Sequence, residues 1–252
     1  MATQLFHISD VHFGVEDRAA LAEVAREVEH EKPDALVCTG DLTQRATHRQ
    51  YAQAADWFAQ FEVPVWLDVG NHDMPYFNLW ERFTDPYRRF LGLHRAVAET
   101  HFETDDLVLI RLNTTVRAQA RWPWSDGVVK PDALEATLRQ LAQFKGDKRR
   151  LIVTAHHPLH GPEVGGPTAT IGGNEAYDRL VDHGMDAIMT GHIHQPFNEH
   201  RPAATGAAQV IGAGTLSTRL RHGAPPSYNV LTATGSSANP IEVETRIIGG
   251  AS

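Results

Sequence analysis

The sequence predicts an α/β fold in which parallel strands alternate with helices. Short apolar runs of strand length, such as LFHIS and DALVCT, are separated by segments whose apolar residues recur at helical spacing. This alternation is typical of βαβ units, which carry helices on both faces of a parallel sheet. The chain has 252 residues, enough to bury a large core, and we expect one domain over residues 1–252.

The first third of the chain contains predicted strands and helices in strict alternation. Three strands are expected, at residues 5–9, 34–39 and 63–69. The helices between them cover residues 16–32 and 47–61, where apolar residues follow the period of a helix. The second helix opens with Thr47 and Gln50, which match a capping box.

The rest of the chain continues this pattern less regularly. Residues 74–93 are predicted to be irregular or helical. We then expect a hairpin at residues 101–114. Two further helices are predicted at residues 131–144 and 174–184, and two further strands at residues 149–158 and 186–191. Residues 160–173 are rich in Gly and Pro and predict a long loop. From about residue 209, strand-like runs are expected to form a second sheet or to extend the first.

Composition and charge narrow the function. The net charge of −8 disfavours non-specific binding to a nucleic-acid polymer, although bound cations would offset part of it. The single cysteine, Cys38, excludes an internal disulfide and fits a reducing compartment, so we expect a cytoplasmic protein. The N-terminus lacks the pattern of a signal peptide, and no apolar run has the length of a membrane span, so no membrane partner is expected.

Five short polar motifs each follow an apolar strand. They contain Asp10 and His12, Asp41, Asn71 with His72 and Asp73, His156 and His157, and His192 and His194. The carboxyl ends of neighbouring parallel strands meet at one edge, so these motifs should converge there. In an extended segment, the side chains of residues two apart project to the same side, so the two residues of each D-x-H or H-x-H pair would bind at one site.

The donor atoms of these motifs indicate a metal centre. They are oxygen and nitrogen without sulfur, a set that suits Mn, Fe, Co, Ni or Zn. There are more donors than one ion needs, and two ions roughly 3.5–4 Å apart with a bridging carboxylate would use them. Taken singly, each motif also fits an ordinary turn or helix cap, and GNHD fits a turn because Gly and Asn tolerate unusual backbone angles. We expect His7 to be structural, and His48 and His94 to be solvated or capping.

The segments HISDVHFG, GDLTQ, GNHD, HHP and GHIH resemble, in order and spacing, the calcineurin-like metallophosphoesterase family, from residue 5 to about residue 200. This resemblance implies a four-layer αββα sandwich with a dimetal site at the carboxyl ends of the strands. Within the family, GDLTQRA and RLNT are similar to the bacterial class III cyclic-nucleotide phosphodiesterase group.

The resemblance also implies a role for each motif residue. One metal would be held by Asp10, His12 and His194, and the other by Asn71, His156 and His192. Asp41 would bridge the two ions, whose identity among Mn, Fe, Zn, Co and Ni, divalent or trivalent, stays open. Catalysis would use His72, which lies beside the phosphate, and Asp73, which orients His72 or supports the turn. His157 would be a close neighbour of the metal.

The function implied is hydrolysis of small phosphodiesters, with 3',5'-cyclic nucleotides as candidates, by a hydroxide that bridges the metals. His72 would protonate the leaving alkoxide or stabilise the phosphate oxygens. A phosphomonoesterase or protein phosphatase of the same fold is the main alternative. A nuclease is disfavoured by the acidic charge, a lipid-linked pyrophosphohydrolase by the lack of a membrane-docking helix, and a non-catalytic scaffold by the complete set of metal positions.

Residues that bind substrate are harder to predict. Arg45 follows GDLTQ and is the preferred partner for phosphate, whereas Arg117, Arg219 and Arg221 are expected to be solvated. Asn113 would line the site or cap a turn. The aromatic residues Tyr76, Phe77, Trp122 and Trp124 are expected to pack in the core. The apolar strands of the tail offer a surface for a homodimer.

Overall fold

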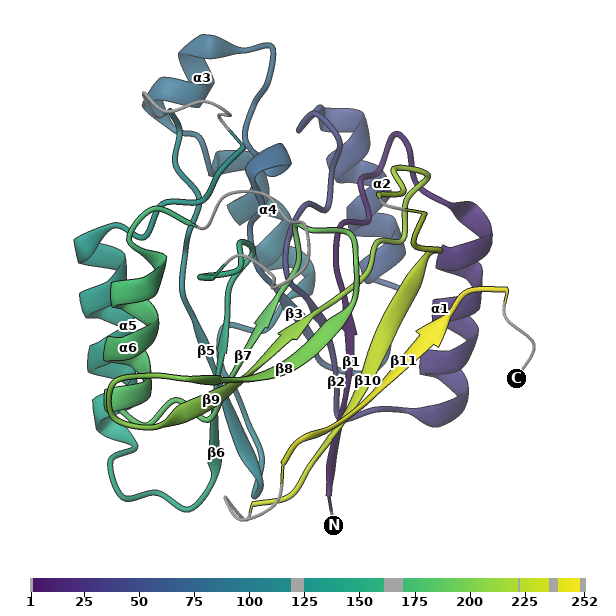
Figure 1. Ribbon diagram of the computed structural model, residues 1–252. Coiled ribbons are helices and arrows are strands. Elements are labelled where there is room, and N and C mark those ends of the chain that lie inside the picture. The colour runs from purple at the N-terminus through teal and green to yellow at the C-terminus, as the bar shows by residue number, and fades with distance from the viewer. Residues whose placement is uncertain (1, 119–124, 161–169, 222, 236–239, 250–252) are drawn as a thin grey trace.

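The computed structural model describes residues 2–118, 125–160, 170–221, 223–235 and 240–249. These residues form two mixed sheets that pack face to face, with helices outside them (Figure 1). The first sheet has the order β11-β10-β1-β2-β3, with strands Glu242–Ile247, Ser227–Ala233, Thr3–Ile8, Ala35–Cys38 and Val65–Leu67. The second has the order β4-β5-β6-β7-β9-β8, with strands Phe102–Glu103, Leu107–Arg111, Arg150–Thr154, Ala187–Thr190, Ala207–Gly212 and Phe197–Pro202.

Helices cover only the outer face of each sheet. Helices α1 (Arg18–Glu31) and α2 (His48–Phe58) pack on the first sheet, and α5 (Pro131–Gln143) and α6 (Gly173–Asp182) pack on the second (Figure 1). The inner faces of the two sheets meet in a third apolar cluster. The four-layer αββα sandwich is therefore confirmed.

The expectation of helices on both faces of one parallel sheet was wrong. Along β1, Leu5 faces the other sheet while Phe6 faces the helices, so both faces are buried. A continuous apolar run is what this double burial requires. The apolar run does not reveal whether helices or a second sheet cover the second face. In this protein, one face of the first sheet packs against helices and the other face packs against the second sheet.

Local signals placed the ends of several elements correctly. Thr47 and Gln50 form the predicted capping box of α2, and Pro131 is the first residue of α5. Strands β4 and β5 form the predicted hairpin. The tail does both things that the sequence allowed, since β9 joins the second sheet and β10 and β11 extend the first.

The segment between β3 and β4 contains two helices, α3 (Leu79–Thr84) and α4 (Arg88–Val97). His94 of α4 was expected to be solvated or capping, but its ring is buried and packs 5.7 Å from that of Phe90. This burial lowers the pKa of His94 to about 4. Most of the predicted loop at residues 160–173 lies outside the described residues.

Parallel pairing brings the motifs together. Strands β1, β2 and β3 run parallel to one another, and so do β5, β6, β7 and β9. The loops at their carboxyl ends therefore gather at one end of the sandwich, at the top in Figure 1.

Candidate metal centre

Residues of three of the five motifs have an unusual backbone. Asp10, His12, Asp41, His192 and His194 all have positive φ angles, between 51° and 69°. Such left-handed angles cost roughly 1–3 kcal/mol each in residues other than Gly and gather at functional sites. The expectation of extended D-x-H and H-x-H pairs was therefore wrong about the backbone. It was also wrong about the second pair, because His194 lies beside Asp10 whereas His192 lies beside His156.

The first cluster consists of Asp10, His12 and His194, all fully or almost fully buried. The Asp10 Oδ1 atom lies 3.0 Å from His194 Nε2 and 3.5 Å from His12 Nε2. The two Nε2 atoms are 3.1 Å apart. The other carboxylate oxygen of Asp10 accepts hydrogen bonds from the Ser9 hydroxyl and the His192 N–H, which fix its orientation.

Ring tautomers decide what these short distances mean. His194 Nδ1 donates to the Arg219 carbonyl at 2.6 Å, and His12 Nδ1 faces the Thr43 carbonyl at 3.4 Å. In the neutral rings the Nε2 atoms then carry lone pairs. Lone pairs and a carboxylate oxygen thus face one another, and Asp10 Oδ1 has no hydrogen-bond partner among the described residues. A cation or a proton must lie between such atoms, and this fits a metal ion.

A second group of donors adjoins the first. Asp41 Oδ2 lies 3.3 Å from His156 Nε2 and 3.8 Å from His12 Nε2, so this carboxylate stands between the two groups. His156 Nε2 is 3.2 Å from the Asn71 amide oxygen, while its Nδ1 donates to the Thr39 carbonyl at 2.8 Å. The His192 ring is 5.2 Å from the His156 ring, and neither of its nitrogens has a hydrogen-bond partner in the described part of the chain.

His157 differs from its neighbours. Its Nδ1 lies 2.8 Å from the Thr114 hydroxyl, and its Nε2 lies 2.9 Å from the Ser125 carbonyl. A carbonyl accepts only, so Nε2 carries the proton and Nδ1 accepts from the hydroxyl. His157, His156 and His192 are close enough to hold an ion together, but both nitrogens of His157 are already engaged. The structure therefore favours the other two rings as ligands.

Electrostatics agree with a site built for cations. Burial alone would raise the pKa values of Asp10 and Asp41, but the surrounding imidazoles outweigh it and hold both pKa values well below the usual range. Burial lowers the pKa of His156 as well, yet the Asp41 carboxylate reverses this and raises it to about 9. Burial and the nearby His156 lower the pKa of His192 to about 3. A proton held at His156 would have to leave for a metal to bind there.

Glycines permit the close approach of the loops. A Cβ at Gly70 would lie 2.1 Å from Asp41 Oδ1, and one at Gly191 would lie 1.8 Å from the Ser9 hydroxyl oxygen. Gly70 has an ordinary φ of −101°, so the expectation that GNHD needs glycine for an unusual backbone angle was wrong. The reason is space for the Asp41 carboxylate.

His72 and Asp73 occupy different surroundings. The His72 N–H donates to Asp41 Oδ1 at 2.8 Å, and its ring Nδ1 lies 2.8 Å from the Gln44 carbonyl, which leaves Nε2 toward the cluster. The buried Asp73 carboxylate accepts from the N–H groups of Leu42, Thr43 and Gly70 and from the Thr43 hydroxyl. Burial and the Asp41 charge raise the pKa of Asp73 to about 7, against the effect of these donors. Asp73 thus joins two loops and does not orient the His72 ring.

The candidates for substrate contact lie elsewhere than expected. Arg45 is exposed and its guanidinium stacks on Tyr76 and Phe77, 5.2 and 5.4 Å from the ring centroids. The Asn113 amide oxygen accepts from the N–H and the hydroxyl of Thr115, so it caps a turn. Arg219, expected to be solvated, reaches the cluster, where its Nη1 lies 3.1 Å from His72 Nε2. A sequence signal did exist, because TLSTR follows an apolar strand as the other motifs do.

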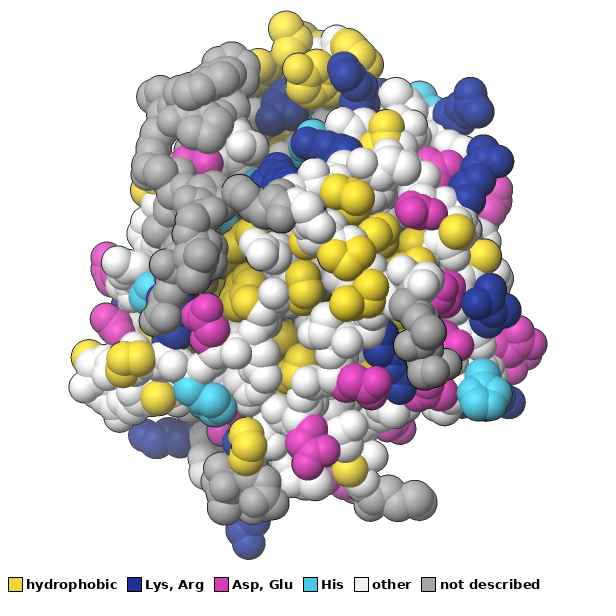
Figure 2. Space-filling model, turned by 45° about the vertical axis from the view of Figure 1, so that its right-hand side comes forward, with side chains coloured by type: hydrophobic (Ala, Val, Ile, Leu, Met, Phe, Trp, Pro, Cys, Tyr) yellow, Lys and Arg dark blue, Asp and Glu magenta, His cyan; other side chains and the backbone are white. Residues whose placement is uncertain are grey.

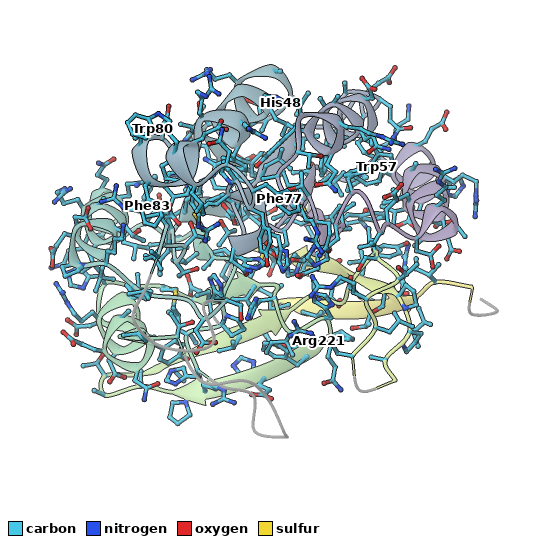
Figure 3. All side chains as sticks on the ribbon, turned by 90° about the horizontal axis from the view of Figure 1, so that it is seen from above. His48, Trp57, Phe77, Trp80, Phe83 and Arg221 are labelled. Carbon is cyan, nitrogen blue, oxygen red and sulfur yellow. The ribbon has the colours of Figure 1, made fainter. Side chains whose placement is uncertain are left out.

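Large apolar side chains, most of them aromatic, are exposed at the same end of the molecule. Tyr76, Phe77, Leu79, Trp80 and Phe83 are 50–79% exposed, and Figure 2 shows hydrophobic side chains gathered at the top. In the view from above, Phe77 lies near the middle, whereas Trp80 and Phe83 lie toward one side (Figure 3). The expectation that Tyr76 and Phe77 pack in the core was wrong. Trp122 and Trp124 lie outside the described residues.

Comparison with known families agrees with this geometry. The model of the calcineurin-like phosphoesterase family matches residues 3–196, which include all five motifs. The chain belongs to this family. It is accordingly a hydrolase of phosphoric esters, and its buried Asp and His clusters are able to hold metal.

Curated relatives share about a quarter of their residues with the chain. A probable cyclic nucleotide phosphodiesterase of Synechococcus is 26% identical over 220 residues, covering 81% of this chain and 78% of the relative. The 3',5'-cyclic adenosine monophosphate phosphodiesterase CpdA of Pseudomonas aeruginosa is 24% identical over 210 residues, covering 78% and 71%.

Solved structures share the fold. A dimetal phosphatase from Danio rerio has a TM-score of 0.66 at 13% identity, covering 98% of this chain and 99% of that one. A purple acid phosphatase from yellow lupin has the same TM-score at 14% identity, covering 98% of this chain and 52% of its own. Within the described residues, none of the helices is long and apolar enough to span a membrane.

Proposed function

We propose that this phosphoesterase is a dinuclear metal phosphodiesterase that hydrolyses small phosphodiesters, with 3',5'-cyclic nucleotides as the physiological class. The observation that carries the proposal is the set of imidazole nitrogens and carboxylate oxygens that face one another at 3.0–3.8 Å in two adjoining groups. Support for the substrate class comes from the names of the relatives, a probable cyclic nucleotide phosphodiesterase and a 3',5'-cyclic adenosine monophosphate phosphodiesterase.

Each group would hold one transition-metal ion. Asp10, His12 and His194 would bind the first, Asn71, His156 and His192 would bind the second, and Asp41 would contact both. The donor set suits divalent or trivalent ions of Mn, Fe, Zn, Co or Ni. Bound there, the two ions would activate a water molecule and offset the charge of the phosphate.

His72 would act on the substrate itself. Its Nδ1 proton is held by the Gln44 carbonyl, so a second proton would sit on Nε2, which faces the cluster. From there it could pass to the alkoxide that leaves as the ester bond breaks. Asp73 would be a positioning residue, because it fixes the loop of Asp41 against the loop of His72. Arg45 would contact only a part of the substrate that lies outside the cluster, since its guanidinium is exposed.

The test is to compare a diester with a monoester. Hydrolysis of bis(p-nitrophenyl) phosphate and p-nitrophenyl phosphate is measured with Mn²⁺ added and again after chelation, followed by cyclic AMP. We expect a metal-dependent preference for the diester and hydrolysis of cyclic AMP. Preference for the monoester would instead establish a phosphomonoesterase with the same metal site.

Three further expectations belong to this proposal. One domain over residues 1–252 and a cytoplasmic location stay predictions, the latter resting on the single buried Cys38. A homodimer also stays a proposal, but its expected surface changes. Strands β9 and β10 lie inside their sheets, and the edge strand β11 exposes Glu242 and Glu244. The exposed aromatic residues around α3 are the better surface, which sedimentation velocity would test.

A further inference from the structure

Arg219 lies on the loop after β9, and its side chain returns to the histidine cluster. The Nη1 atom is 3.1 Å from His72 Nε2, 3.3 Å from His12 Nε2 and 3.3 Å from the Gln44 amide oxygen. In the described part of the chain, no carboxylate oxygen lies within 4.0 Å of this guanidinium. A half-buried arginine is therefore left with neutral acceptors only, although Asp41 and Asp10 act on it from farther away.

The loop that carries Arg219 is fixed to the same cluster. The Thr215 hydroxyl donates to the Asp10 carbonyl at 2.7 Å and lies 2.7 Å from the Ser217 hydroxyl. The Arg219 N–H donates to that second hydroxyl at 3.3 Å, and the Arg219 carbonyl accepts from His194 Nδ1. Thr215 and Ser217 are completely buried. The backbone of Arg219 is thus held by residues of the first cluster, which places its side chain reproducibly.

A metal-loaded site would take one partner from the guanidinium and leave the Gln44 amide oxygen in place. If His12 gives its Nε2 lone pair to a metal ion, that lone pair no longer accepts from Arg219. The guanidinium then has donors free for a further acceptor, and phosphate oxygens match its planar, multiple donors better than any neutral group.

We propose that Arg219 binds a non-bridging oxygen of the substrate phosphate. This rests on the proposed function, because it assumes that the phosphate binds at the cluster. Arg219 takes the part that the sequence suggested for Arg45. Arg221 does not share it, since its Nη1 donates to the His192 carbonyl at 3.2 Å. The positive charge of Arg219 should favour the more negative phosphate, so it should contribute more to binding a dianion than a monoanion.

The experiment measures binding of inorganic phosphate by calorimetry to protein reconstituted with Mn²⁺, with metal content determined in parallel. The variants are Arg219→Met, which removes the donors, and Arg219→Lys, which keeps the charge but not the planar fork. Arg201→Met is the matched control, because Arg201 is half-buried on β8 at the opposite end of the sheet and pairs with Glu199. A hydrogen bond to a charged group contributes about 1.5–3 kcal/mol, which corresponds to roughly a 10- to 150-fold change in Kd.

We expect Arg219→Met to weaken phosphate binding within that range, Arg219→Lys to weaken it less, and the control to change it less than about twofold. Metal content should stay the same in all three. Unchanged phosphate affinity in Arg219→Met, or loss of metal from it, would overturn the proposal. If Arg219→Met does not fold, the phosphate affinity of Arg219→Lys tests the proposal instead. An affinity equal to that of the wild type would then contradict the assignment of Arg219 as a phosphate ligand.

The same titration separates this inference from the proposed function. Phosphate binding requires no turnover, so it can be measured even if the protein hydrolyses no diester. Failure of the diester assay together with weaker phosphate binding by Arg219→Met would refute the phosphodiesterase and retain Arg219 as a phosphate ligand. Diester hydrolysis by the wild type together with unchanged phosphate affinity in Arg219→Met would retain the phosphodiesterase and refute Arg219 as a phosphate ligand.

Discussion

The loops of the metal cluster and the segment around α3 lie at the same end of the molecule, yet they are built in opposite ways. The loops bury charged and polar residues, of which Asp10, His12 and Asp41 are at most 1% exposed. The segment around α3 exposes apolar ones, with Trp80 79% exposed. Buried polar groups persist only when they are paired or bind a cation, whereas exposed apolar groups are tolerated singly and gather where a surface has a use. We therefore expect the loops to carry out the chemistry and the segment around α3 to take no part in it.

The largest effect is expected at Asp41, the carboxylate that stands between the two groups. Asp41→Ala should strip metal from the protein and abolish diester hydrolysis, beyond the roughly 10,000-fold upper range expected for loss of a general acid. Metal content and turnover are measured on the same sample. Asp41→Asn, which retains one oxygen ligand, should keep part of both. A variant Asp41→Ala that retains two ions per chain would contradict the assignment.

His72→Ala should separate chemistry from metal binding. We expect turnover to fall by about 100- to 10,000-fold, the typical contribution of a general acid, with metal content unchanged. The steady-state rate and elemental analysis give the two readouts. His200→Ala, at an exposed position on β8, is the control and should behave like the wild type. Loss of both ions from His72→Ala would show that this ring is a ligand.

Asp73→Ala tests a role in stability. Three buried N–H groups, of Leu42, Thr43 and Gly70, lose their acceptor, and each unsatisfied donor costs about 1–3 kcal/mol. We expect the free energy of unfolding to fall by about 3 kcal/mol in chelator, measured by urea denaturation. Asp56→Ala, exposed on α2, should change it by less than about 0.5 kcal/mol. Equal stability of the two variants would refute the role of Asp73 as the link between the loops.

The smallest effect is expected in the exposed segment. Trp80→Ser and Phe83→Ser remove side chains that are 79% and 50% exposed, so turnover of bis(p-nitrophenyl) phosphate should stay within about twofold of the wild type. Metal content should not change. A tenfold loss of turnover in either variant would contradict the distinction between the two regions, because the segment around α3 would then take part in the reaction.

The two regions also differ in how far the sequence predicts them. Asp10, Asp41, Asn71 and His156 each follow an apolar strand, and parallel strands bring their ends together, so their convergence could be predicted. The left-handed backbone of Asp10 and His12 could not, because positive φ in residues other than Gly is imposed by the surrounding loops. His192 and His194 also have positive φ angles, and for this reason their side chains do not lie at one site as those of an extended pair would.

The aromatic segment and Arg219 show why the rest was missed. Most aromatic side chains in proteins are largely buried. The sequence around Tyr76 and Phe77 contains no signal that these two side chains are exposed. An arginine is solvated in most proteins, and the position of Arg219 depends on strand β9 pairing with β7. That pairing joins strands separated by residues 191–206, which include the strand β8, and sequence periodicity does not encode such a topology.

The most direct test of the central claim is the number of metal ions that activity requires. Metal-free protein is titrated with Mn²⁺ while bound metal and the rate of bis(p-nitrophenyl) phosphate hydrolysis are recorded together. The account predicts that the rate rises to a plateau at two ions per chain. Full activity at one ion per chain, or activity that does not depend on bound metal, would contradict it.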